Sequence, residues 1–127
     1  MAAVRDVLVD ARNVLRSRWP NIPEAEVVEL AGRWAAARGV RVHLVFDGRA
    51  PGGLVGELDV DPSLRLIGTG TESADDAIAR IAKRWRAEGR PFRLVTSDRE
   101  LRRRGGEGAA VTGGGSFAGE LLAERAT

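Results

Sequence analysis

Short runs of apolar and β-branched residues alternate with helix-forming segments along the whole sequence. Strands are expected at 7–10, 40–46, 63–69 and 91–98, with a weaker one at 108–113, and helices at 23–39, 73–89 and 116–126. The helices carry apolar residues at helical spacing, and Gly39 and Gly89 stand where the first two should end. Strands that alternate with helices form a parallel sheet covered on both faces. We therefore expect a single α/β domain over 1–127, a three-layer α/β/α sandwich with a central, mainly parallel sheet.

The segment 48–63 interrupts this rhythm because it is rich in Gly and Pro. We expect it to be a long surface loop, most simply a tolerated insertion, although a substrate-contacting loop remains open. Asn21, Ser73 and Ser116 stand where side chains could cap the three helices.

The composition narrows the class of protein. A chain of 127 residues has room for one core, and the absence of cysteine excludes disulfides and thiolate metal sites. The sequence contains no apolar run long enough to cross a bilayer and begins without the apolar core of a signal peptide. We expect a cytoplasmic protein with no membrane partner.

Five acidic residues stand at or just after the ends of expected strands. Asp10 ends the first strand and Asp47 follows the second, Asp75 and Asp76 open the helix after the third, and Asp98 ends the fourth. Parallel strands bring their carboxyl ends to one edge of the sheet, where ligands bind. Carboxylates gathered there repel one another unless a cation lies among them, and oxygen ligands suit Mg²⁺ or Mn²⁺. Taken together, these acids at four strand ends favour a metal site.

Each acid also has a simpler explanation. Aspartate after a strand is common in turns, and acids in the first turn of a helix interact favourably with its dipole. For Asp76, helix capping and catalysis are equally supported. Asp98 could cap a short helix that begins at Arg99.

Arginines accompany these acids. Arg12 and Arg49 each follow an acid by two residues, and Arg99 and the run 102–104 follow Asp98. Guanidinium groups around an acidic metal site match a phosphodiester backbone, because cations can hold the flanking phosphates. The run 102–104 also fits a solvated helix face.

Other chemistries lack support. The segment "GTGTES" has Ser73 in place of the third glycine of a dinucleotide-binding motif, and no Walker A motif is present. The single histidine, His43, lies within an expected strand and is expected to be structural, so a catalytic triad is unsupported.

The motifs "LVDARN", "VFDG", "TESADDAI", "VTSDRELRRRG" and "GAAVTGGGSFAGEL", in this order, resemble the YacP-like branch of the NYN domains, within the PIN-like nuclease superfamily. The resemblance covers nearly the whole chain. It implies a metal-dependent ribonuclease of the α/β/α fold. By motif, Asp10, Asp75 and Asp98 match the family's acids, Asp47 matches the aspartate of "FDG", and Asn13 matches the asparagine after the first strand.

This sequence departs from the family in one segment. The family often has Gly and an aromatic residue between the first Asp and the Asn, whereas this chain has Ala11 and Arg12. The departure removes an aromatic surface on which a base could stack.

The resemblance and the residues together suggest an endoribonuclease with one or two Mg²⁺ or Mn²⁺ ions, acting on single-stranded or ribosome-associated RNA. Asp10, Asp75 and Asp98 are the expected catalytic ligands, with Asp47 and Asp76 completing the metal site. The expected substrate-binding residues are Arg12, Asn13, Arg49, Ser97, Arg99 and Arg102.

Two alternatives stay open at this point. The first is a catalytically weak RNA-binding or ribonucleoprotein-associated module that uses the same arginines. The second, a phosphatase, is disfavoured because "DARN" lacks a second acid two residues after Asp10. The oligomeric state, a homodimer included, and a toxin role with an antitoxin are also open.

Overall fold

The computed structural model describes residues 3–126. Six strands form one sheet in the order β3-β4-β2-β1-β5-β6. All neighbouring strands are parallel except β3 and β4, which are antiparallel. The strands are β1 (Asp6–Asp10), β2 (Arg41–Phe46), β3 (Gly56–Asp61), β4 (Leu64–Gly68), β5 (Phe92–Val95) and β6 (Ala110–Thr112). The predicted central, mainly parallel sheet is confirmed.

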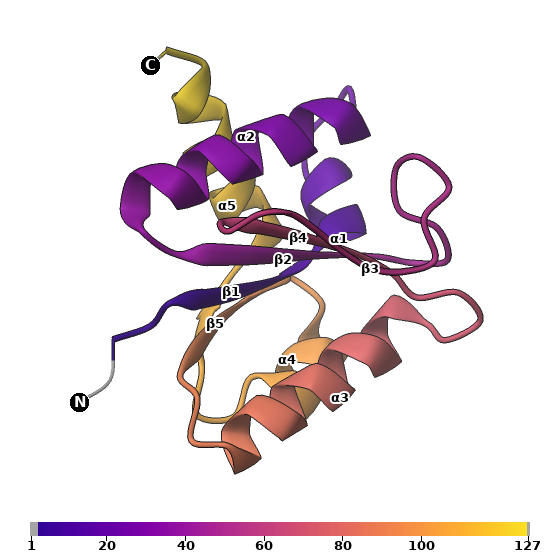
Figure 1. Cartoon of the computed structure of the whole chain (residues 1–127), viewed down its shortest axis with the longest axis vertical. Helices are drawn as coiled ribbons and strands as arrows, with labels where there is room; N and C mark the ends of the chain where they lie inside the picture. Colours follow the sequence, from indigo (N-terminus) through magenta and orange to yellow (C-terminus); the bar gives the residue numbers. More distant parts are fainter. Residues whose placement is uncertain (1–2, 127) are drawn as a thin grey trace.

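Helices cover both faces of this sheet (Figure 1). Helices α1, α2 and α5 lie on one face, and α3 and α4 lie on the other. The bounds are α1 (Ala11–Leu15), α2 (Glu24–Arg38), α3 (Ala74–Ala87), α4 (Arg99–Gly105) and α5 (Gly114–Ala123), followed by a 3₁₀ turn at Glu124–Ala126. The three-layer α/β/α arrangement expected from the sequence is therefore present.

Strands β1, β2, β4 and β5 each contribute to two cores, because successive side chains of a strand point to opposite faces. In β1, Val7 and Val9 pack with the core beneath α2 and α5, whereas Leu8 packs with the core beneath α3 and α4. All three are at most 2% exposed. The continuous apolar run of β1 is thus explained by its central position in a sheet covered on both sides.

The expectation of a loop over 48–63 is wrong for residues 56–61, which form the edge strand β3. All six residues of β3 are exposed, so the strand has no buried face to mark it in the sequence. It is held instead by its ladder with β4 and by ion pairs from Arg65, whose Nε lies 2.7 Å from Asp59 Oδ1. Earlier in the segment, the loop around Ala50–Leu54 closes against Gly68, where a Cβ would lie 2.0 Å from the Leu54 carbonyl oxygen.

Of the caps predicted for α2, α3 and α5, two are wrong and one is confirmed. Ser73 caps α3 by accepting a hydrogen bond from the Asp76 N–H at 3.1 Å. Helix α2 begins after Pro23 with no side-chain cap, so Asn21 does not cap it. Ser116 lies inside α5, which starts two residues earlier, at Gly114. The Gly114 N–H is already bound by the Ser97 hydroxyl, and the helix end is therefore satisfied from another segment.

A buried polar cluster joins three segments at the amino end of the sheet. Asp6 of β1 accepts two hydrogen bonds from Arg90, both at 2.7 Å, and lies 2.8 Å from Nε2 of His43. Burial alone raises the pKa of the Asp6 carboxyl, but the hydrogen bonds from His43 and Arg90 outweigh this and hold the pKa well below its usual range. His43 is 1% exposed and packs edge-on against Trp85, which confirms its structural role.

Within the described chain, no helix has the length and apolar character needed to span a membrane.

Replacing Asp6 tests how much this cluster contributes to the free energy of unfolding. We expect Asp6→Asn to lower the free energy of unfolding by about 2 kcal/mol at pH 7, because Arg90 loses its carboxylate. The stability that a depressed carboxyl pKa contributes is present above the unfolded-state value of about 4 and is lost as the pH falls. In urea unfolding, the difference from wild type should therefore shrink below pH 4. Glu107→Gln, an exposed acid elsewhere, is the matched control and should change little at either pH.

Candidate active site

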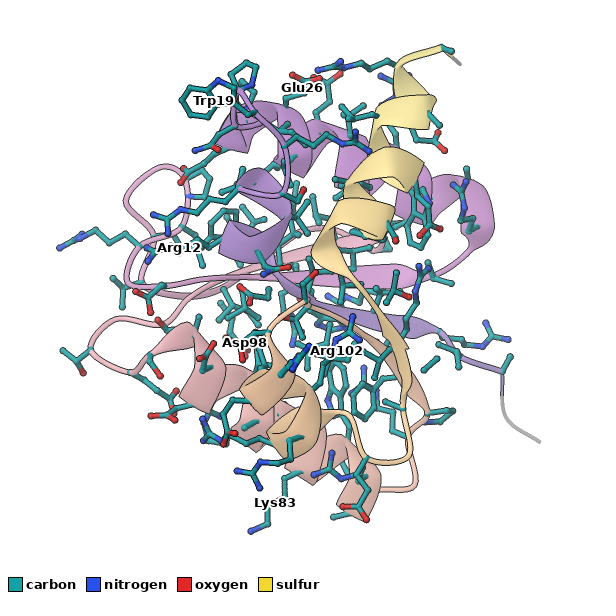
Figure 2. The ribbon with its side chains drawn as sticks, turned by 180° about the vertical axis from the view of Figure 1, so that it is seen from behind. Arg12, Trp19, Glu26, Lys83, Asp98 and Arg102 are labelled. Atoms are coloured by element: carbon teal, nitrogen blue, oxygen red, sulfur yellow. The ribbon has the colours of Figure 1, made fainter. Side chains whose placement is uncertain are left out.

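A pocket of about 330 Å³ opens at the carboxyl edge of the sheet, between the ends of β1 and β2 and the first turns of α1, α3 and α4. It brings together segments that are far apart in the sequence. Its lining residues are Asp10, Arg12, Asn13, Arg16, Asp47, Ser73, Ala74, Asp75 and Asp98. The structure therefore gathers four of the five predicted acids into one pocket. Figure 2 shows Arg12 and Asp98 on the same side of the molecule, above and below the sheet.

Asp10 is a buried acid of the pocket. It is the last residue of β1, only 8% of it is exposed, and it caps α1. One carboxylate oxygen faces the Asn13 N–H at 3.5 Å, and the other accepts a hydrogen bond from the Thr96 hydroxyl at 3.2 Å. This cap belongs to a short helix that was not predicted from the sequence, and it fixes the carboxylate at the end of the strand.

Thr96 connects two of the acids. Its hydroxyl is fully buried, donates to Asp10, and accepts a hydrogen bond from the Asp98 N–H at 3.1 Å. Asp98 then caps α4 through the Leu101 N–H at 2.9 Å. Arg102 holds the same strand end, because its Nε donates to the Thr96 carbonyl oxygen at 2.9 Å. This threonine therefore sets the position of Asp98 relative to Asp10.

Asn13 joins three segments behind the acids. Its side-chain oxygen accepts a hydrogen bond from the Ser97 N–H at 2.9 Å. The Ser97 hydroxyl in turn accepts from the Gly114 N–H at 2.9 Å. A Cβ on Gly114 would lie only 2.1 Å from the Asn13 oxygen, so glycine is required for this approach. Asn13 and Ser97 thus have defined scaffold roles in addition to the substrate contacts predicted for them.

Asp47 fixes the position of the start of α3, the segment that carries Asp75. One of its oxygens accepts a hydrogen bond from the Ala74 N–H at 2.9 Å, at the first residue of α3. The other oxygen lies 3.6 Å from Nη2 of Arg12. Asp47 therefore ties the end of β2 to the start of α3, and this tie places Asp75 in the pocket.

Asp76 lies outside the pocket, although it is adjacent to Asp75 in the sequence. Its carboxylate is 57% exposed and pairs with Nη2 of Arg104 at 2.9 Å. It lines a separate surface depression with residues of α3 and α4. The structure thus separates two neighbouring acids that the sequence could not distinguish.

Of the arginines predicted to bind substrate, some line the pocket and others do not. Arg12 lines the pocket, whereas Arg49 and Arg99 are exposed and do not line it. Arg49 donates to the Gly53 carbonyl oxygen at 3.2 Å. Arg16 lines the pocket and was missed by the sequence interpretation, although its spacing of four residues from Arg12 on α1 was a usable signal.

The carboxyl groups of the pocket affect one another. Burial raises the pKa of Asp10, the hydrogen bonds from Asn13 and Thr96 oppose this, and the charges of Asp75 and Asp98 raise it further. Burial also raises the pKa of Asp75, with a further contribution from the charge of Asp98. The ionised pocket therefore carries unfavourable electrostatic energy at neutral pH, which a bound cation would relieve.

The sequence from residue 7 to residue 126 matches the family model of the YacP-like NYN domain. The chain belongs to this family. NYN domain proteins are generally nucleases that act on RNA. A search of curated proteins found no significant match.

The chain shares its fold with solved structures of a YacP protein. The crystal structure of Rae1 (YacP) from Bacillus subtilis is 21% identical, with a TM-score of 0.68, and the match covers 98% of this chain and 76% of that chain. The W164L mutant of the same protein is also 21% identical, with a TM-score of 0.70 and coverage of 94% and 76%.

The donor chemistry of the pocket fits a hard divalent cation, because all of its candidate ligands are oxygen atoms. Among residues 3–126, however, no three His, Cys, Asp or Glu side chains are grouped closely enough to hold one ion together. Mg²⁺ in proteins is commonly held by one or two carboxylates and several waters. The pocket of this YacP-like NYN domain fits that kind of site better than a closed cage of carboxylates.

Two neighbouring glycines provide a test of the Asn13 contact. We expect Gly114→Ala to lower the free energy of unfolding by about 2 kcal/mol, because the new methyl group displaces the Asn13 side chain. Gly115→Ala is the matched control: its Cβ would meet only Ser17, at 3.8 Å, and should leave stability unchanged or raise it slightly. Urea unfolding at pH 7 measures both. Equal stability of the two variants would show that α5 does not pack on Asn13 in this way.

Proposed function

We propose that this protein is a divalent-metal-dependent endoribonuclease that cuts RNA at the carboxyl-edge pocket. The proposal rests on one observation: Asp10, Asp75 and Asp98, from three separate segments, line the same pocket as Arg12 and Arg16. Family membership supports the same activity, since NYN proteins are generally nucleases that act on RNA.

Asp10, Asp75 and Asp98 are the residues that would hold Mg²⁺ or Mn²⁺, directly or through water, with Asp47 as a further oxygen donor. Such an ion, when bound, polarises the phosphate and lowers the pKa of a coordinated water. Asp76 takes no direct part in this proposal, because its carboxylate is paired with Arg104.

The remaining residues of the site bind and orient the substrate. Arg12 and Arg16 are placed to hold phosphates next to the acids, and Arg99 can bind the strand further out. Arg102 and Asn13 are positioning residues, because they fix the backbone around Thr96 and Ser97. The arginines supply charge, while the acids decide where cleavage occurs.

An RNA-binding module without efficient cleavage, acting on free RNA or on a ribonucleoprotein, is the second candidate. It is favoured by the absence, within residues 3–126, of three carboxylates grouped for one ion. It would use the same arginines and would leave bound RNA intact.

Cleavage assays on the two adjacent acids test the nuclease proposal. A labelled single-stranded RNA should be cut by wild type with Mn²⁺ or Mg²⁺ and should stay intact with EDTA. Asp75→Asn should lower the cleavage rate at least about a hundredfold, because an acid of the pocket loses its charge. Asp76→Asn should retain most of the activity, because this side chain faces Arg104.

Asp98→Asn should behave like Asp75→Asn while it keeps the capping oxygen of α4. If no protein cuts RNA with any metal but all of them bind it, the binding-module candidate replaces the nuclease.

Thermal unfolding separates metal binding from cleavage. With Mn²⁺ at about ten times its dissociation constant, binding to the folded state adds about 1.4 kcal/mol, which raises the Tm of a domain of this size by about 5 °C. The shift should be lost in Asp98→Asn and kept in Asp76→Asn. An equal shift in both variants would place the ion elsewhere on the protein.

A further inference from the structure

Trp19 stands out from the other two tryptophans of the chain. Its side chain is 92% exposed, whereas Trp34 and Trp85 are 3% and 1% exposed. Trp34 packs edge-on against Phe117 at 5.0 Å between ring centroids, and Trp85 packs against His43 at 4.8 Å. Trp19 has no comparable ring contact within residues 3–126. A large aromatic side chain left in water calls for an explanation other than packing.

The loop that carries Trp19 is anchored at both ends. It joins α1 to α2 and spans 16–23. On one side the Ser17 hydroxyl donates to the Val14 carbonyl oxygen at 2.7 Å. On the other side Ile22 is buried, and its N–H donates to the Leu15 carbonyl oxygen at 3.1 Å. The exposed ring is therefore presented by a fixed loop, so little ordering is needed to bind a flat ligand.

The sequence segment that carries Trp19 is positively charged. The segment 11–23 contains Arg12, Arg16 and Arg18 and no acidic residue. Arg16 and Arg18 make no ion pair with any acid of the described chain, whereas Arg12 lies 3.6 Å from Asp47. Arg16 also lines the pocket, so it connects the Trp19 loop to the acids. Arginines that make no ion pair among the described residues and stand within three residues of an exposed aromatic residue fit a ligand that carries both phosphates and planar bases.

We propose that Trp19 is a stacking platform for a base of single-stranded RNA whose backbone passes Arg16 and Arg12 on its way into the pocket. RNA as the ligand rests on the proposed function; the stacking surface itself rests on the exposure and charge of this loop. Figure 2 shows Trp19, Arg12 and Asp98 in that order along one side of the molecule. Bases within a duplex are already stacked and paired, so this surface selects single strands.

A protein partner fits this loop less well. Aromatic residues at the centre of protein interfaces are surrounded by other apolar contacts that exclude water. The other exposed large apolar residues of the described chain all lie outside the Trp19 loop: Val4, Val55, Leu58, Val60 and Val111. Trp19 is instead flanked in sequence by arginine and proline.

Fluorescence quenching gives a direct test, because Trp19 is the exposed tryptophan and the other two are buried. The protein is titrated with acrylamide in EDTA, which keeps RNA uncut, with and without a uridylate hexamer. The hexamer should lower the quenching of Trp19 several-fold. An abasic ribose-phosphate hexamer of the same charge should not, because it has no base to stack. Equal protection by both oligomers would overturn the proposal, as would protection by neither.

Variants test the same surface by affinity. Trp19→Ala should weaken binding of the uridylate hexamer by about tenfold, the usual contribution of one stacked base, while Trp19→Phe should restore most of it. Binding of a short RNA duplex should be equal in wild type and Trp19→Ala. Val60→Ala, on the exposed edge strand β3, is the control and should leave hexamer binding unchanged. Unchanged hexamer binding by Trp19→Ala would overturn the proposal.

The two proposals fail in different ways. Metal-dependent cleavage without protection of Trp19 would contradict the stacking proposal and support the nuclease proposal. Protection of Trp19 by the hexamer without cleavage supports the platform and removes the nuclease. Quenching that falls when the protein alone is concentrated would assign Trp19 to contact with a second copy of the chain, and would overturn the proposal.

Discussion

The parallel pairing of β1 with β2 on one side and β5 on the other is the constraint on which the site depends. In this register Asp10 pairs with Val45, and Val9 pairs with Val95. Both neighbours therefore end at the same level as β1, and the acids that follow them emerge at one edge. The same strands are fastened at their other end by hydrogen bonds of Asp6 with His43 and Arg90. Burial of both faces makes any slip in this register costly.

Hydrogen bonds of polar side chains then join the segments that form the pocket at this edge of the sheet. Polar groups removed from water need hydrogen-bond partners, and here those partners join segments. Thr96 links Asp10 to the start of α4, Asn13 links α1 to the strand end after β5, and Asp47 links β2 to α3. The acids are consequently held in place by the fold itself, while the arginines around them remain on the surface. Carboxylates held by hydrogen bonds, with exposed arginines around them, suit a flexible polyanionic substrate.

Much of this fold could be predicted from the sequence, because strands and helices buried in two cores must carry regular apolar patterns. The fully exposed strand β3 lacked that signal: its residues are fixed by β4 and by ion pairs with Arg65, not by burial. The start of α5 was also missed, because its first N–H group is satisfied by Ser97, seventeen residues away. Arg16 was missed although it stands four residues after Arg12, because no helix was predicted over residues 11–15.

The sequence by itself determined the family, the sheet edge at which the acids gather, and the oxygen and guanidinium chemistry found there. All three follow from the order of strands, helices and acidic residues along the sequence, which can be read without the structure. Only the tertiary structure decided which acids share the pocket. Asp75 and Asp76 are consecutive, yet one faces the pocket and the other faces Arg104. Successive residues of a helix point about 100° apart, so the orientation of α3 on the sheet makes that choice. The exposure of Trp19 was decided in the same way, by how the loop after α1 is anchored.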